Sequence, residues 1–159
     1  MSQIYLKLFN YIQNSSFSDI TGDILRLNKE QDDLGIYNAE YVTIDNSSFT
    51  NIEGAIAKIY RGGTDESTFG PHLTVTDSAF RKVGFGKRNK TKASFFLHGV
   101  QDTDMINNAF DRTAPVIIEH TVGEPQTLIK GNKFRGVDLP QVTEVFTKGE
   151  STAVLIDNN

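Results

Sequence analysis

Residues 41–52 read YVTIDNSSFTNI, and closely related stretches recur along the chain. Each contains a phenylalanine in the same surroundings, and these five residues, separated by 32, 31, 30 and 24 positions, are Phe17, Phe49, Phe80, Phe110 and Phe134. An apolar residue lies five positions before each of them: Ile12, Ile44, Val75, Met105 and Ile129. Three positions before them lie Asn14, Asn46, Asp77, Asn107 and, as the exception, Gly131. Such self-similarity is typical of a repeat protein.

Within each repeat the apolar residues alternate with polar ones, which is the period of a strand with one buried face. Asn, Ser and Asp follow, and they favour turns. A second apolar stretch comes after the Phe, as in residues 23–28, 55–60 and 115–120. The pattern predicts an all-β chain folded as a right-handed parallel β-helix (solenoid) of about five coils, with polar loop insertions and no clear caps.

In a parallel β-helix, equivalent residues of successive coils stack at about 4.8 Å. We therefore expect the repeated Phe and Ile positions to form internal ladders, and Asn14, Asn46 and Asn107 to form a partial ladder at the turn. The alternative is a β-sandwich with regularly spaced strands. A sandwich needs alternation, but it does not need the same residue type at the same offset in every unit.

Residues 1–159 are expected to form a single domain. Ile4, Leu6 and Leu8 match Ala55, Ala57 and Ile59, so we expect the sequence to begin in the middle of a coil. At the other end, AVLIDNN (153–159) resembles YVTIDNS (41–47). Because solenoids need polar caps at their termini, we expect the chain to be a fragment of a longer protein or to close its ends by association.

The composition excludes several classes of protein. The net charge is −4 and the pI is near 5.3, which argues against general nucleic-acid binding. There is no cysteine, so disulfides and thiolate zinc sites are excluded. The apolar runs are too short to cross a membrane, and the first residues lack the apolar stretch of a secretory signal.

Three polar insertions interrupt the repeat, at residues 60–72, 84–94 and 119–125. Loops on a rigid solenoid are frequent binding sites. His98 and His120 each end a second strand, so they are expected to be neighbours in the stack, either as an interior hydrogen-bonded pair with His120 pointing inward or as a pair facing a ligand. His98, His120 and Glu119 could converge on a metal ion, but the sequence has no ligand spacing that is specific to zinc or calcium.

One outward row is expected to contain Lys7, Arg26 and Lys58, followed by Leu97 and Glu119. Stacked cations repel one another unless an anion or water lies over them. A uronic acid polymer would match the row, and ordinary solvation of long basic side chains explains it equally well. The candidate substrate-binding residues are Lys7, Arg26, Lys58, Arg61, Arg88, Asn89, Lys90, Lys92, His98 and His120.

Residues 60–75, 86–101 and 117–125 resemble segments of the C-terminal β-helix domain of polysaccharide lyase family 6, which includes alginate lyases and chondroitinase B-like enzymes. The resemblance covers about Gly22 to Phe134 and is closer to the alginate lyases. It implies a parent enzyme that cleaves a uronate polymer by β-elimination. It also implies that the catalytic Lys and Arg, and any calcium, belong to an N-terminal domain, so no catalytic residue, metal ligand or cofactor is assigned to this chain.

The leading hypothesis is therefore a non-catalytic C-terminal domain of an alginate lyase, which supports the catalytic domain, its substrate cleft or dimerisation. The expected partners are alginate, the N-terminal catalytic domain or a second copy, with no nucleic acid and no membrane, in a secreted or periplasmic bacterial protein. A carbohydrate-binding module for polyuronate is the alternative. An enzyme using Lys90 or Lys92 as base, with Arg88 and His98, and a structural solenoid such as a phage fibre also stay open.

Overall fold

The computed structural model describes residues 9–28, 41–60 and 71–159 of the chain. These residues form sixteen strands and no helix. The strands are β1 (Phe9–Gln13), β2 (Ser16–Ile20), β3 (Leu25–Leu27), β4 (Tyr41–Asp45), β5 (Ser48–Ile52), β6 (Ala57–Tyr60), β7 (His72–Thr76), β8 (Ala79–Val83), β9 (Phe95–His98), β10 (Asp102–Ile106), β11 (Ala109–Asp111), β12 (Val116–Val122), β13 (Gln126–Lys130), β14 (Lys133–Arg135), β15 (Gln141–Lys148) and β16 (Thr152–Ile156). Over these ranges no helix exists that could span a membrane.

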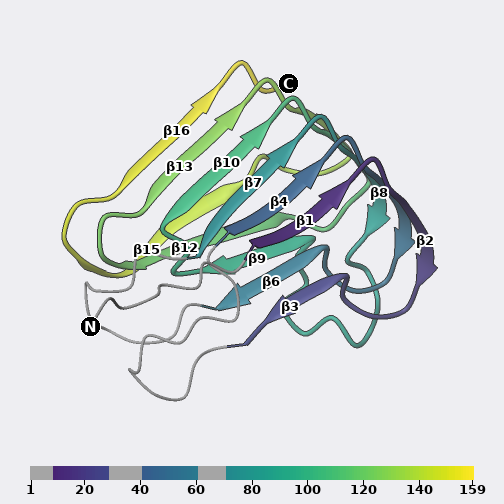
Figure 1. The fold of residues 1–159 in the computed structure, drawn as a ribbon, viewed down its shortest axis with the longest axis horizontal. Helices are drawn as coiled ribbons and strands as arrows, with labels where there is room; N and C mark the ends of the chain where they lie inside the picture. The colour runs from purple at the N-terminus through teal and green to yellow at the C-terminus, as the bar shows by residue number, and fades with distance from the viewer. Residues whose placement is uncertain (1–8, 29–40, 61–70) are drawn as a thin grey trace, which may run out of the picture.

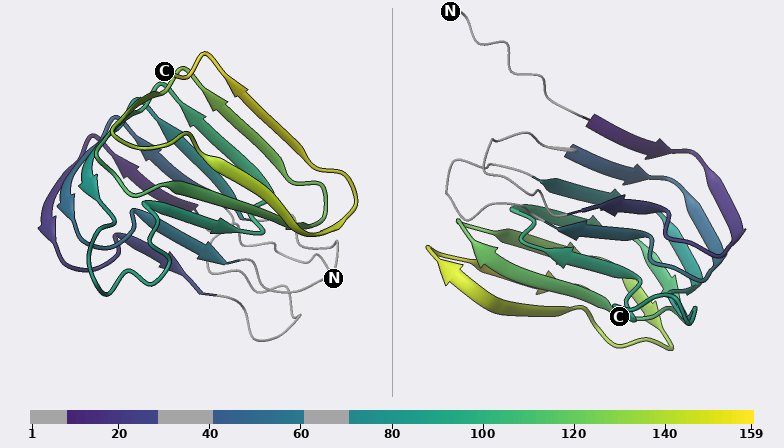
Figure 2. Two further views of the ribbon diagram at one scale, coloured as in Figure 1. Left: turned by 180° about the vertical axis from the view of Figure 1, so that it is seen from behind. Right: turned by 90° about the horizontal axis from the view of Figure 1, so that it is seen from below.

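The strands form three parallel sheets that the chain visits in turn. The first sheet has the order β1-β4-β7-β10-β13-β16, the second β14-β11-β8-β5-β2 and the third β15-β12-β9-β6-β3. In Figure 1 the strands of the first sheet run side by side from purple β1 to yellow β16, with the third sheet packed below them. The view from behind in Figure 2 shows the same stacking of coils. The chain is a right-handed parallel β-helix, as predicted, and the parallel pairing throughout excludes the sandwich.

Each of the five complete coils contains three strands, one more than the two that the sequence pattern indicated, and β16 begins a sixth coil. The phenylalanine repeat itself forms the strands of the second sheet, as in β5. In β5 both Phe49 and Ile52 are buried, three positions apart, because Asn51 between them has a φ of 56°. The left-handed residue breaks the alternation by which a strand is recognised.

The repeated phenylalanines form a continuous stack through the interior. Successive ring centroids, from Phe17 through Phe49, Phe80 and Phe110 to Phe134, lie 5.1, 5.2, 4.9 and 4.8 Å apart. The apolar residues five positions earlier are also in register between coils: Ile12, Ile44, Val75, Met105 and Ile129. Both predicted ladders are confirmed, and burial of each large side chain contributes about 2–3 kcal/mol of transfer free energy.

The corner between the first and second sheets is built from left-handed residues. The φ angle is 50° at Asn14, 43° at Asn46, 48° at Asp77, 58° at Asn107 and 66° at Gly131. Asn, Asp and Gly tolerate this region best, which explains why Gly131 is the exception to the pattern. Asn46 Nδ2 donates to Asn14 Oδ1 at 2.6 Å, so the expected partial ladder begins as predicted. Asp157, with a φ of 54°, continues the corner at the position equivalent to Gly131, because Lys130 pairs with Ile156. The expected alignment of AVLIDNN with YVTIDNS placed Asp157 opposite Asp45, so it was wrong by one residue.

A buried polar ladder, not predicted from the sequence, runs beside this corner. It consists of the next residue in each repeat: Ser47, Ser78, Asn108, Asn132 and Asn158. Each side chain accepts from the backbone N–H of the preceding coil, as Asn132 Oδ1 does from Asn108 at 2.8 Å. Asn132 Nδ2 also donates to the carbonyl of Met105 at 2.8 Å. The ladder therefore satisfies backbone groups where the chain leaves the first sheet.

Candidate functional site

The insertion between β8 and β9 is organised around the side chain of Asn89. Its Nδ2 donates to the carbonyls of Gly84 and Ala93, each at 2.8 Å, and Thr91 Oγ1 donates to Asn89 Oδ1 at 2.9 Å. Asn89 is 5% exposed, so its amide ties the ends of the loop together and does not face a sugar, contrary to the expectation. Four cationic side chains around it are exposed: Lys87, Arg88, Lys90 and Lys92.

The predicted cation row on the third sheet is wrong in its register. Arg26 pairs with Lys58, but Lys58 pairs with Phe96, and Leu97 points into the core at 0% exposure. Glu119 belongs to the neighbouring row. The register differs from the prediction because the prediction aligned strands by their ends, whereas the insertions change where each strand stops.

Of the cations in that row, only Arg26 is seen to be exposed. Lys58 is 6% exposed, and its Nζ lies 3.2 Å from Asp23 Oδ1, so its charge is paired within the protein. Removing an ammonium group from water is costly unless such a partner is present. Lys7 and Arg61, with most of the insertion at 60–72, lie outside the described residues.

His98 lies beside Glu119, and not beside His120 as predicted. The two residues are in register on β9 and β12, and His98 Nδ1 is 2.7 Å from Glu119 Oε2. β12 continues three residues beyond this pair, to Val122, so the expected insertion at 119–125 begins as strand. The ring of Tyr60 lies 6.0 Å from that of His98. The His98 side chain is 33% exposed, so it is part of the outer surface of the third sheet.

His120 points into the core, as the alternation of β12 predicted. It is 1% exposed, and its Nε2 lies 2.9 Å from Thr127 Oγ1. Burial lowers the pKa of the His120 imidazole below its usual value of 6.5, and the carboxylate of Glu144 opposes the shift. An interior, largely neutral His120 cannot contact a polymer. Because His98 faces outward, the two histidines and Glu119 do not converge, and no other trio of potential metal ligands gathers in the described ranges.

A second concentration of exposed positive charge, apart from the loop around Asn89, lies on the second sheet. We call it the arginine face: Arg81, Lys82, Arg112, Lys133 and Arg135, with Asp111 at its centre. Asp111 on β11 is in register with Arg81 on β8 and Arg135 on β14. Its oxygens lie 3.4 Å from Arg81 Nε and 3.9 Å from Arg135 Nε. Arg112 donates to both carboxylate oxygens, through Nε at 3.2 Å and Nη2 at 2.9 Å.

The arginines determine the protonation state of Asp111. The hydrogen bonds from Arg112 lower the pKa of the Asp111 carboxyl below its ordinary value, and the charges of Arg112, Arg135 and Arg81 act in the same direction. Asp111 is therefore an anion throughout the neutral range. One carboxylate neutralises one of the five cations, so four positive charges remain on this face.

The sequence carries a signal for the arginine face that the prediction missed. The residues after three successive repeated phenylalanines read FRK at 80–82, FDR at 110–112 and FRG at 134–136. Residues at the same offset stack in a β-helix, so these cations had to gather on one surface. The prediction did not treat the phenylalanine segments as separate strands, and therefore did not test which residues lie outside them.

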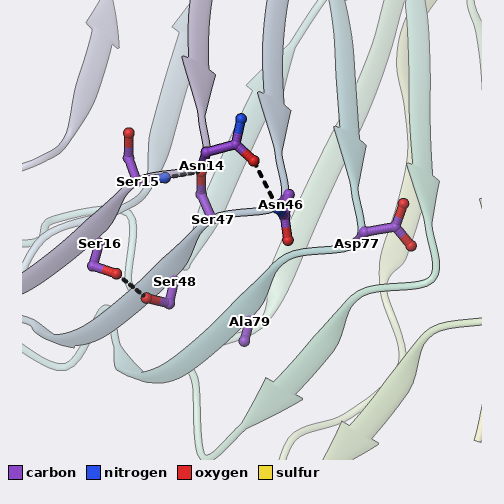
Figure 3. Close-up of a pocket in the computed structure, with 8 residues that line it drawn as sticks. All are labelled: Asn14, Ser15, Ser16, Asn46, Ser47, Ser48, Asp77 and Ala79. Atoms are coloured by element: carbon purple, nitrogen blue, oxygen red, sulfur yellow. Dashed lines mark hydrogen bonds between the residues drawn. The ribbon is translucent and has the colours of Figure 1, made fainter.

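A shallow polar hollow of about 340 Å³ lies at the corner between the first two sheets. Figure 3 shows its lining, which spans three coils: Asn14, Ser15, Ser16, Asn46, Ser47, Ser48, Asp77 and Ala79. Many of its polar groups bond to one another. The hydroxyl groups of Ser16 and Ser48 share a hydrogen bond of 2.9 Å, and Ser47 Oγ accepts a hydrogen bond from the backbone N–H of Ser15 at 3.1 Å. These bonds connect the coils, so the hollow is mainly a structural feature.

The class of protein that these observations define is a right-handed parallel β-helix of three sheets with a cationic patch outside one of them. Among solved structures, the chain is similar to the PL6 family alginate lyase AlyGC, with 53% sequence identity and a TM-score of 0.87. The match covers 94% of this chain and 21% of that one. An arginine-to-alanine mutant of AlyGC matches with 52% identity and a TM-score of 0.80, over 91% and 21% of the two chains.

The resemblance to polysaccharide lyase family 6 that the sequence indicated is therefore confirmed. The chain spans about a fifth of the length of these alginate lyases. No family model and no curated protein matches it.

Proposed function

We propose that this chain is a non-catalytic part of an alginate lyase, and that the whole enzyme cleaves uronate polymers by β-elimination. The observation that carries the proposal is the 53% identity over 94% of the chain to a fifth of a PL6 family alginate lyase. The TM-score of 0.87 shows that the two chains share the fold over this stretch. The match to one part of a much longer enzyme favours a supporting role.

The chemistry of β-elimination also supports this role. The reaction needs a base to remove the proton at C5 of the sugar, and a positive group to neutralise the adjacent carboxylate. Lys90 and Lys92 lie in an exposed loop ahead of β9. His98 is the last residue of that strand, about 10 Å along it from its first residue. A lysine serves as a base most readily where it is buried or lies beside another positive charge in a closed site, and the side chains of Lys90 and Lys92 are exposed. An exposed loop followed by a distant histidine therefore favours a supporting role over a catalytic one.

In this proposal the chain supports a catalytic domain elsewhere in the enzyme, shapes its substrate cleft or contributes to dimerisation. A calcium ion, if the enzyme uses one, would bind in that catalytic domain. Because alginate is an extracellular polymer, the whole protein would be secreted or periplasmic.

Incubating the purified 159-residue chain with polymannuronate and with polyguluronate tests the proposal. β-Elimination creates a carbon–carbon double bond in the product, which absorbs in the ultraviolet. We expect no increase in absorbance with either polymer. An increase in proportion to the concentration of the chain would show that it is an enzyme in its own right.

Binding of polyuronate is a second candidate function, and the surplus of cations on the arginine face favours it. Electrophoresis in gels that contain alginate would detect it as a delay in migration, at low salt where charge contacts are strongest. Unchanged migration would exclude this function.

A further inference from the structure

We propose that the arginine face is a binding site for a uronate polymer lying across β8, β11 and β14. This inference rests on the proposed function, because it takes the polymer to be the substrate of the whole enzyme. It assigns the contact to the second sheet, and not to the row on the third sheet that the sequence suggested.

The first argument is the distribution of charge. The chain has a net charge of −4, yet the arginine face has five cations around one carboxylate. The same outer row is uncharged in the two earlier coils, where it holds Ser18 and Thr50. Along this row, positive charge therefore occurs only in the later coils. Like charges at this spacing repel one another, and an anion lying over them would relieve the repulsion.

The second argument is the position of the guanidinium groups. The ion pairs that join Asp111 to Arg81 and to Arg135 are made at Nε, so the terminal amino groups of both side chains can serve as donors to a ligand. The side chains of Arg81 and Arg135 are 56% and 88% exposed. A guanidinium group offers a planar pair of N–H donors that matches a carboxylate. Asp111 and Arg112, which are joined by two hydrogen bonds, hold the centre of this arrangement between the two donors.

The third argument is periodicity. Arg81 and Arg135 flank Asp111 in one row, and Lys82 and Arg112 follow in sequence at the adjoining corner. Successive coils are about 4.8 Å apart. A uronate polymer carries one carboxylate on every sugar, so a chain running along the solenoid axis would present anions repeatedly to these cations. A single small anion would use only a part of the face.

Affinity electrophoresis of the full chain with paired variants tests the site. Arg81→Gln with Arg135→Gln removes two charges from the arginine face. Arg26→Gln with Lys130→Gln removes two exposed charges from the third and first sheets and serves as the matched control. Thermal unfolding of both variants checks that they are folded. The gels contain alginate, alginate whose carboxylates have been reduced to alcohols, or heparin as a sulfated polymer.

We expect alginate to delay the unmodified chain, and the reduced polymer to have no effect. The arginine-face variant should bind alginate about tenfold more weakly, while the control changes by less than about twofold. Equal losses in both variants would show that only net charge matters, and would overturn the proposal, as would the absence of delay or stronger retention by heparin than by alginate. Turnover of alginate is measured separately, so failure of the proposed function would be distinguished from failure of this site.

Discussion

At the scale of single residues, His120 couples the stability of the fold to pH. Its imidazole is buried, and burial lowers its pKa below 6.5. As the pH falls through 6.5, the unfolded chain takes up a proton that the folded chain still excludes, so the free energy of unfolding should decrease. His120→Gln should make this decrease smaller. Urea unfolding at several pH values between 8 and 5 measures the free energy of unfolding. If it changed with pH equally in the variant and in the unmodified chain, the account would be contradicted.

Asn132 allows a second test at this scale. Its side chain, 0% exposed, accepts from the backbone N–H of Asn108 and donates to the carbonyl of Met105. Asn132→Ala leaves both groups buried without these partners and should cost about 2–5 kcal/mol in the free energy of unfolding. Chemical denaturation measures it.

The control is Asn107→Gly at the exposed corner, since Gly131 occupies the equivalent position in the next coil. It should change the free energy of unfolding by about 0.5 kcal/mol or less. If Asn132→Ala and Asn107→Gly had the same free energy of unfolding, the buried ladder would not stabilise the fold by satisfying backbone groups.

At the scale of elements, the phenylalanine stack holds the coils in register. Phe110 lies between Phe80 and Phe134, with ring centroids at 4.9 and 4.8 Å. Phe110→Ala should lower the free energy of unfolding by about 3–5 kcal/mol, because it leaves a cavity inside the stack. Phe85→Ala is the control, since Phe85 is 66% exposed. If Phe110→Ala lowered the free energy of unfolding by no more than Phe85→Ala does, the stack would contribute little to stability.

The ladders could be predicted from the sequence because stacking requires the same residue type at the same offset, as Phe17 to Phe134 show. The strands of the second sheet could not be found by alternation, since left-handed residues such as Asn51 interrupt it. The register of the third sheet was also missed. Alignment by strand ends placed His98 beside His120, whereas the pairing of β9 with β12 joins His98 to Glu119. The candidate site on the third sheet was displaced by this error.

At the scale of the whole molecule, the fold, the likeness to a fifth of an alginate lyase and the arginine face support one account. In this proposed account the β-helix is a rigid support, the catalytic chemistry would belong to another part of the enzyme, and the cationic surface would hold the polymer. The account therefore assigns to the arginine face a role in binding by charge complementarity.

The most direct test of this account is a calorimetric titration of the purified chain with an alginate oligosaccharide, followed by analysis of the recovered sugar. The account predicts heats that decline to zero as the site saturates, and an oligosaccharide that is recovered intact. A steady heat that continues after saturation, together with unsaturated products of lower mass, would contradict it.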